Sequence, residues 1–209
     1  MAEKLARPLQ DCVMMAFPTP ITVYEWPESG DLNRQLAEIV FAEEASAPSL
    51  GKSNVGGWHS PNDFILRDTP PMRQLIDRAR TMTGELTRAF RAPKNYGFKI
   101  EGWANVLRRG QYNNIHNHPN CTWSGVYYVT GNPPPDPEED TGFSGKIEFH
   151  DPRPGATMSF SEDDKLQRQL LLSPKAGTMI MFPSWLHHSV HPYFGREARI
   201  SIAFNVIIS

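Results

Sequence analysis

The pattern of hydrophobic and polar positions divides the chain into a mixed first half and a second half of short extended runs. Alternation within ITVYEW, residues 21–26, predicts a strand. Residues 31–45 and 72–92 instead carry apolar side chains at helical spacing, so each segment predicts an amphipathic helix. We expect Asp31 to be the N-cap of the first helix, because a short side-chain oxygen can accept a hydrogen bond from the first turn.

From residue 97 onward the period of the pattern changes from that of a helix to that of a strand. Six β-type runs follow one another, separated by Gly, Pro and Asp turns: GFKIEGWANVLRRG, WSGVYYVTG, GKIEFHD, LQRQLLLS, GTMIMFPS and ARISIAFNVII. No helical pattern interrupts them, so we expect mostly antiparallel strands in a sandwich, jelly roll or barrel. The segment 131–145, which is rich in proline and acidic residues, predicts a loop that is either a lid or a solvated connector.

The last run, RISIAFNVI, has two different faces at period two. One face is apolar and typical of a core: Ile200, Ile202, Phe204 and Val206. The other face is mostly polar although the strand should be central: Arg199, Ser201, Ala203 and Asn205. We therefore predict a wet cavity inside the β-fold, with Tyr128 of SGVYYV on the same side. The two helices would then cover the outer, apolar side of the sheet.

Composition indicates an ordinary globular chain. Its 209 residues are 39% hydrophobic and 21% charged, which is enough to bury a core without disulfide bonds. We expect one domain over 1–209. Within it, residues 1–96 would supply an N-terminal strand and supporting helices, and 97–209 the β-core with its site.

Charge and cysteine content narrow the partners and the compartment. A net charge of −2 leaves no clear nucleic-acid footprint, and no apolar run approaches the roughly 20 residues of a membrane helix. The N-terminus lacks the apolar core of a secretory signal. Cys12 and Cys121 are too few for a disulfide framework, so we predict a cytoplasmic protein.

The histidines carry the strongest chemical signal. Five of the seven lie in two clusters, His116 and His118 in NNIHNHPN and a second group in HHSVH, 187–191. At positions i and i+2 of an extended segment, His116 and His118 point to the same side and can reach one ion. A third ligand from the second cluster would leave coordination positions open, as in catalytic metal sites. The alternative is a set of surface histidines, and we expect His59 and His150 to be surface or second-shell residues.

The order of these motifs resembles the iron(II)- and 2-oxoglutarate-dependent oxygenases. HxH, SGVYYV, GKIEFHDP, GTMIMFPSWLHHSVHP and ARISIAFN follow one another in that order, and the match covers roughly 97–208. It is most similar to the uncharacterised bacterial and phage branch. The resemblance implies a mainly β fold with flanking helices, the double-stranded β-helix (jelly roll, cupin-like). It also implies Fe(II) and 2-oxoglutarate as cofactors, and hydroxylation of an unknown substrate.

The resemblance also implies a set of metal ligands. The family's first motif is His-x-Asp or His-x-Glu, and His116 matches its histidine. His118 stands where the carboxylate belongs, so the metal is held either by three imidazoles or by a weakened site. His188 matches the distal histidine through HSVHP, while His187 and His191 fit less well.

The same resemblance assigns the co-substrate contacts. Arg199 and Ser201 form the R-x-S pair that anchors the distal carboxylate of 2-oxoglutarate, and a guanidinium suits that role because it forms two charge-assisted hydrogen bonds. Tyr128 would share the carboxylate and Asn105 would add a polar contact. Arg196, in the turn FGREA, is the weaker candidate for the anchor.

Two other functions are compatible with the same residues. One is a three-histidine dioxygenase of cupin type that does not use 2-oxoglutarate. The other is a non-catalytic metal-binding β-barrel module. The substrate itself is not predicted, although we expect the loops 50–66 and 131–145 to contact it.

Overall fold

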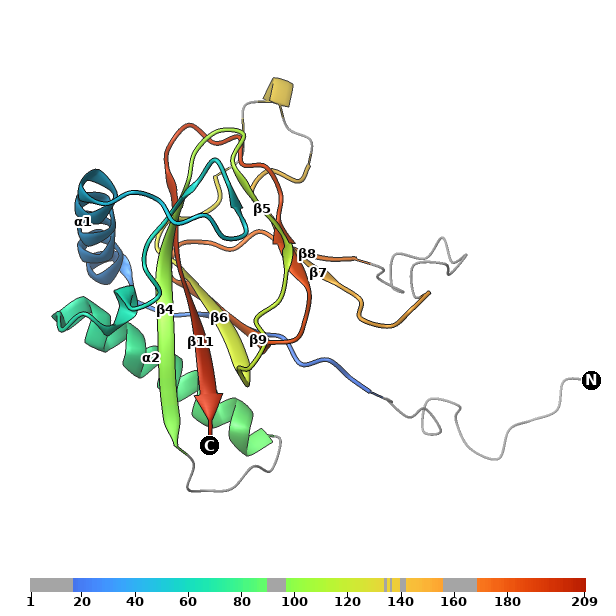
Figure 1. Cartoon of the computed structure of the whole chain (residues 1–209). Coiled ribbons are helices and arrows are strands. Elements are labelled where there is room, and N and C mark those ends of the chain that lie inside the picture. Colours follow the sequence, from blue (N-terminus) through green and yellow to red (C-terminus); the bar gives the residue numbers. More distant parts are fainter. Residues whose placement is uncertain (1–16, 90–96, 134, 136, 140–141, 156–168) are drawn as a thin grey trace, which may run out of the picture.

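The structure is a computed structural model that describes residues 17–89, 97–133, 135, 137–139, 142–155 and 169–209. Two antiparallel sheets face each other, and two helices lie against the outer side of one of them (Figure 1). The prediction of a mainly β protein with flanking helices is confirmed. Within the described residues, no helix is both long enough and apolar enough to cross a membrane.

The larger sheet has six strands, all paired antiparallel. In spatial order they are β1 (Thr22–Glu25), β9 (Thr178–Pro183), β6 (Trp123–Tyr128), β11 (Arg199–Ile208), β4 (Phe98–Leu107) and β3 (Trp58–His59). The central position of β11, between β6 and β4, agrees with the burial of most of its residues on both faces.

The smaller sheet has five strands, also antiparallel. In spatial order they are β2 (Asn54–Val55), β5 (Tyr112–His116), β10 (His188–Val190), β7 (Ile147–His150) and β8 (Gln169–Leu172). All six β-type runs expected after residue 97 contain strands. Short 3-10 turns lie at Phe64–Leu66 and Pro137–Glu139.

The two helices form as predicted, with one correction at the start of the first. They are α1 (Gly30–Ser46) and α2 (Pro70–Ala89); residues 90–92 of the predicted second helix lie outside the described residues. The N-cap of α1 is Ser29, so the assignment of Asp31 was wrong. Asp31 lies in the first turn, where its negative charge interacts favourably with the positive end of the helix dipole.

The period-two faces of β11 separate two cores. The outer face packs against α1 and α2 in a core that includes Ile200, Ile202, Phe204 and Val206, each 0% exposed. Phe204 pairs with Gly125 of β6, and a Cβ there would lie 2.3 Å from the phenyl Cζ atom. Only glycine therefore fits beneath this ring.

A second core lies between the two sheets. Its buried members come from three strands, β6, β7 and β9, and one turn: Val126, Tyr128, Ile147, Phe149, Ile180, Phe182 and Leu186. This inner core is smaller than the outer one, and polar side chains border it on the larger sheet: Ser201, Asn205, Arg199 and Thr178. The polar inner face predicted for β11 is therefore present.

Candidate metal centre and buried arginine site

Three histidines from distant parts of the chain converge at the edge of the inner core. One ring nitrogen from each of His116, His118 and His188 lies within 4.8 Å of the others. The ring centroids of His116 and His188 are 4.3 Å apart, and that of His118 lies 5.0 Å from His116 and 5.3 Å from His188. Three imidazoles at this separation can face a single cation.

Strand pairing brings the two histidine clusters together. His116 at the end of β5 is the register partner of His188 at the start of β10. The next segment is held to the end of β9, because the His118 N–H donates to the carbonyl of Ser184 at 2.8 Å. His118 therefore faces the same point as His116 although it lies beyond the strand.

Backbone carbonyls orient two of the three rings. Nδ1 of His116 lies 2.7 Å from the carbonyl oxygen of Asn114, and Nδ1 of His188 lies 3.0 Å from that of Leu186. A carbonyl can only accept, so each Nδ1 carries the proton and donates it. Nε2 is then left with its lone pair free, as a metal ligand requires.

The environment keeps these rings neutral. Burial, reinforced by the nearby His116, lowers the pKa of His118 to about 4 and that of His188 to about 3. The pKa of His116 is also lowered, mainly by burial. At neutral pH all three nitrogens are therefore unprotonated and available to a metal.

The other histidines of the second cluster point elsewhere. His187 is exposed, and His191 lies 2.7 Å from a carboxylate oxygen of the buried Glu148. His150 hydrogen-bonds with Ser189. None of these three belongs to the convergent group, in agreement with the preference for His188.

His59 does not lie at the surface, which was one of the two positions expected for it. It is 3% exposed and stacks on Trp103 with ring centroids 5.5 Å apart and planes 13° from parallel. Trp103 in turn lies 5.4 Å from the His118 ring. His59 therefore packs against the histidine cluster through the Trp103 ring, and it also lines the pocket beside that cluster.

Arg199 is a buried cation without a counter-anion. Its side chain is 2% exposed, and no carboxylate of the described residues lies within the 4.0 Å of an ion pair. Its Nε atom has no hydrogen-bond partner there, and its guanidinium carbon lies 5.1 Å from the Tyr128 ring centroid. Burial lowers the pKa of this arginine. Since an unpaired buried charge is costly, the arrangement fits an anionic ligand.

Further polar atoms without partners surround Arg199. Ser201 is the register partner of both Asn105 on β4 and Tyr128 on β6. The Tyr128 hydroxyl, the Asn105 side-chain oxygen and the Thr178 hydroxyl are buried without hydrogen-bond partners among the described residues. Burial raises the pKa of Tyr128 to about 12, against the opposing effect of Arg199, so its hydroxyl remains a donor. Arg196, the weaker candidate, is exposed.

Along the inner face of the larger sheet, the polarity of the side chains changes between Arg199 and the histidines. Register partners along it are Ser201 with Tyr128, then Ala203 with Val126 and Ile180, then Asn205 with Ser124 and Phe182. The ring of Phe182 lies 4.7 Å from that of His188. An apolar band therefore separates a polar band at Arg199 from the histidine cluster.

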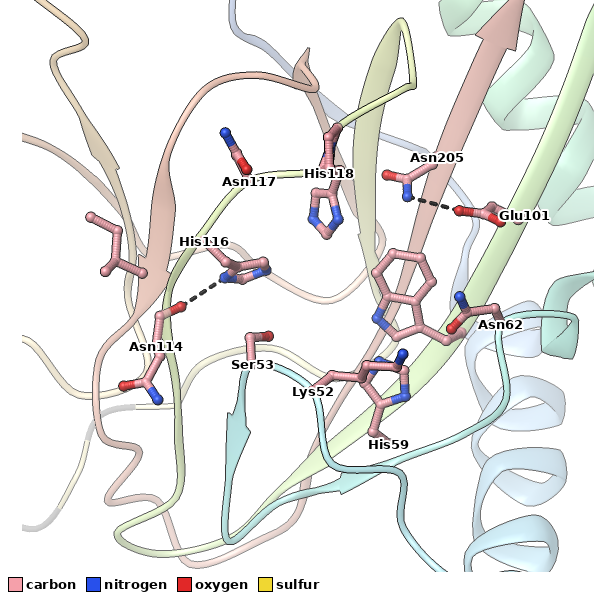
Figure 2. Close-up of a pocket in the computed structure, with 13 residues that line it drawn as sticks. Lys52, Ser53, His59, Asn62, Glu101, Asn114, His116, Asn117, His118 and Asn205 are labelled. Atoms are coloured by element: carbon pink, nitrogen blue, oxygen red, sulfur yellow. Dashed lines mark hydrogen bonds between the residues drawn. The ribbon is translucent and has the colours of Figure 1, made fainter.

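A pocket of about 670 Å³ opens beside the histidines. Figure 2 shows His116 and His118 on one side of it and Glu101, Asn62 and Asn205 on the other. The predicted substrate loop 50–66 contributes lining residues, whereas 131–145 contributes none among its described residues. Arg199 is not among the residues that line this pocket.

Sequence reasoning missed several residues of this region. Glu101 lines the pocket and Thr178 stands beside Tyr128, but neither belongs to a motif. The signal for Glu101 was its alternation with Trp103 and Asn105 on β4, which places all three on one face. Thr178 required the pairing of β9 with β6, which no local pattern specifies.

This fold and site define a jelly-roll protein with a histidine cluster suited to a metal ion. A sequence-family profile described as "Putative 2OG-Fe(II) oxygenase" matches residues 101–205, which is half of the chain. The chain therefore belongs to the 2-oxoglutarate–Fe(II) oxygenase family, as the resemblance in its motifs predicted. No curated protein sequence matches it.

Several solved structures share the fold of this chain. A prolyl-4-hydroxylase from Pseudomonas putida is 14% identical, with 90% of this chain and 91% of that chain covered and a TM-score of 0.60. HygX from Streptomyces hygroscopicus, solved with nickel, 2-oxoglutarate and hygromycin B, is 11% identical over 90% and 82% of the two chains, with a TM-score of 0.60. An oxygenase from Burkholderia pseudomallei is 15% identical over 83% and 79%, with a TM-score of 0.51. The double-stranded β-helix prediction is thereby confirmed.

Proposed function

We propose that this protein is an Fe(II)- and 2-oxoglutarate-dependent dioxygenase that hydroxylates a substrate not yet identified. The observation that carries the proposal is the combination of three neutral histidines with a buried Arg199, which has no carboxylate partner among the described residues, across one apolar band. Family membership supports it, because the family takes its name from these two cofactors.

In this proposal His116, His118 and His188 hold Fe(II). The donor set fits such an ion, since imidazole nitrogen is a normal ligand for iron and all three rings are neutral at pH 7. Three ligands leave room for a co-substrate and oxygen. The backbone bonds at Nδ1 keep His116 and His188 aimed at the ion.

The residues around Arg199 fit the far carboxylate of 2-oxoglutarate. The guanidinium would form two charge-assisted hydrogen bonds to it, and Tyr128, Ser201 and Thr178 offer hydroxyls to the same group. Asn105 would donate from its side-chain amide. Binding of the anion would thus give an acceptor to three buried donors that lack partners among the described residues: Arg199 Nε and the hydroxyls of Tyr128 and Thr178.

The apolar band fits the middle of the co-substrate. Val126 and Ile180 lie on the inner face between the Arg199 end and the histidine end, where the two methylene groups of 2-oxoglutarate would pass. Bound together, Fe(II) and 2-oxoglutarate supply the activation of O2, with decarboxylation to succinate. The chain itself positions both groups and keeps water away from the buried end.

The two rival functions are weaker on the same observations. A three-histidine dioxygenase of cupin type, or a metal-binding module without activity, needs the histidines but does not need a buried arginine that lacks a carboxylate partner in the described part of the chain. The substrates named for the similar structures differ from one another, so none is transferred to this chain. A cytoplasmic setting remains a prediction.

The test is formation of succinate from 2-oxoglutarate by the iron-loaded protein in air, with Arg199→Met and the matched surface variant Arg88→Met. Arg88 is exposed on α2, so Arg88→Met should leave the KM for 2-oxoglutarate unchanged. Loss of a buried charge partner typically costs more than about 2 kcal/mol, so Arg199→Met should raise the KM for 2-oxoglutarate about 30-fold or more. Equal KM values for the wild type and Arg199→Met would reject Arg199 as the anchor of 2-oxoglutarate, and the absence of succinate in the wild type would reject 2-oxoglutarate as the co-substrate.

A further inference from the structure

The pocket beside the histidines contains one acidic side chain that the proposed cofactors do not use. Glu101 lies on β4, lines the pocket, and is only partly exposed. It is not among the convergent ligand atoms at the histidines, so it is not a further ligand of the same ion. Its inward position follows from the alternation that also turns Trp103 and Asn105 inward.

A chain of hydrogen bonds holds this carboxylate in place. The Ser124 hydroxyl donates to the Asn205 side-chain oxygen at 2.8 Å, and the Asn205 amide nitrogen donates to Glu101 Oε1 at 3.1 Å (Figure 2). Ser124 and Asn205 are buried and are register partners on adjacent strands. The first bond orients the Asn205 amide, so the second positions Glu101 before any ligand arrives.

Glu101 has no cationic partner among the residues that the structure describes. Within the described part of the chain, its second oxygen, Oε2, accepts no hydrogen bond, and no Lys, Arg or His nitrogen lies within the 4.0 Å of an ion pair. Lys52 lines the same pocket but is exposed and makes no ion pair among those residues. Its flexible, solvated ammonium contributes little compared with a carboxylate fixed inside a pocket.

The other lining groups are mainly neutral and polar. Side-chain amides of Asn62, Asn114, Asn117 and Asn205 contribute to the wall, and the Trp103 ring forms part of the buried surface between His59 and His118. Amides can hydrogen-bond a polar ligand without adding charge, and an indole face is favourable for a cation. Glu101 therefore sets the charge preference of the inner pocket.

We propose that Glu101 binds a positively charged group of the substrate, a protonated amine or a guanidinium, while the neighbouring part of that substrate faces the metal centre. The substrate class is then an amine-bearing or guanidine-bearing polar molecule or side chain. The assignment as a substrate rests on the proposed function, whereas the binding of a cation at Glu101 does not.

The test measures binding to the metal-free full-length chain, so that it is independent of catalysis. Butylamine, which is protonated at neutral pH, is compared with butanol and with butyrate. Binding is followed through the indole N–H signal of Trp103 in a two-dimensional NMR spectrum, assigned with Trp103→Phe. We expect a saturable shift with butylamine and a much smaller response to the neutral and anionic probes.

Substitutions then test whether Glu101 causes the preference for butylamine. Glu101→Gln keeps the shape and the acceptor for Asn205 but removes the charge, and should weaken butylamine binding about tenfold or more. The control is Glu85→Gln, an exposed residue of α2 that should bind as the wild type does. Glu101→Lys should reverse the preference toward butyrate.

The outcomes distinguish this inference from the function on which it rests. No saturable shift with butylamine, equal binding of butanol, or unchanged binding by Glu101→Gln would overturn the cation site. If the cation binds but no succinate forms from 2-oxoglutarate, the site stands and the proposed oxygenase activity fails. If succinate forms but the cation does not bind, the activity stands and the substrate class is wrong.

Discussion

His118 is the residue in which this chain departs most from the family's motif. It stands where His-x-Asp or His-x-Glu would place a carboxylate, and its ring joins those of His116 and His188. A third neutral ligand leaves the full double positive charge of the ion to be balanced by other groups. In our account the keto-acid end of 2-oxoglutarate provides that balance, which makes metal binding and co-substrate binding depend strongly on each other.

Substitution of His118 tests whether it is a ligand. We expect His118→Ala to lower the affinity for divalent metal by at least about tenfold. Loss of a residue that merely orients a metal ligand already weakens metal binding by about that factor, so loss of a ligand should cost no less. The measurement is competition with a chromogenic chelator. His187→Ala is the control, because His187 is exposed and belongs to the same sequence cluster as His188. An unchanged affinity in His118→Ala would mean that only two histidines hold the metal.

At this scale, the sequence contains the signals for some site residues and lacks them for others. His116, His118, His188 and Arg199 could be selected because spacing and strand alternation are local properties. Thr178 could not, because its place beside Tyr128 depends on how two distant strands pair. The roles of these residues in binding stay predictions.

The element that organises the site is β11. Its two faces serve different purposes: Ile202 is fully buried against the helices, whereas Ser201 faces the inner side beside Tyr128 and Asn105. Because side chains of a strand alternate, neighbouring residues should affect stability and co-substrate binding separately.

Two neighbouring substitutions on β11 test this separation. Ile202→Ala should lower the free energy of unfolding by about 2–5 kcal/mol, as for other buried large-to-small changes, with little effect on the KM for 2-oxoglutarate. Ser201→Ala should leave stability nearly unchanged and raise that KM about tenfold. Denaturant unfolding and succinate assays measure the two effects. Similar losses in both assays for both variants would contradict the two-faced strand.

Elements with a strong local pattern were predictable, and short ones were not. The helices α1 and α2 and the six β-type runs have clear periodicity over many residues. Strands such as β2, β3 and β10 are two or three residues long, so they carry too few residues for a pattern. Their extended form comes from the strands that they pair with.

In the molecule as a whole, the site lies between two sheets, and its ionisable histidines are therefore partly or fully buried. Burial lowers the pKa of His59, His116, His118 and His188 together. These groups are neutral in the folded state at a pH where the unfolded chain already takes up protons. The metal-free protein should accordingly be sensitive to acid. The proposed division into 1–96 and 97–209 within one domain stays a prediction.

The pH dependence of unfolding follows from these shifts. The folded-state pKa values of about 4 for His118 and about 3 for His188 lie below the ordinary value of 6.5. Stability is thus fully present above pH 6.5 and is lost as the pH falls toward 4 and then 3. The denaturant midpoint of the metal-free protein should decrease between about pH 7 and about pH 5. This decrease should be smaller in His118→Gln than in the control His187→Gln. Identical slopes in the two variants would contradict burial of a neutral His118.

The most direct test of the central claim is an anaerobic titration of the Fe(II)-loaded protein with 2-oxoglutarate, followed by visible absorbance. Iron held by the three histidines and chelated by a keto acid should produce a metal-to-ligand charge-transfer band that saturates with 2-oxoglutarate. We expect this band in the wild type, and in Arg199→Met only at a much higher concentration of 2-oxoglutarate. Absence of the band in the wild type with bound iron would contradict the account.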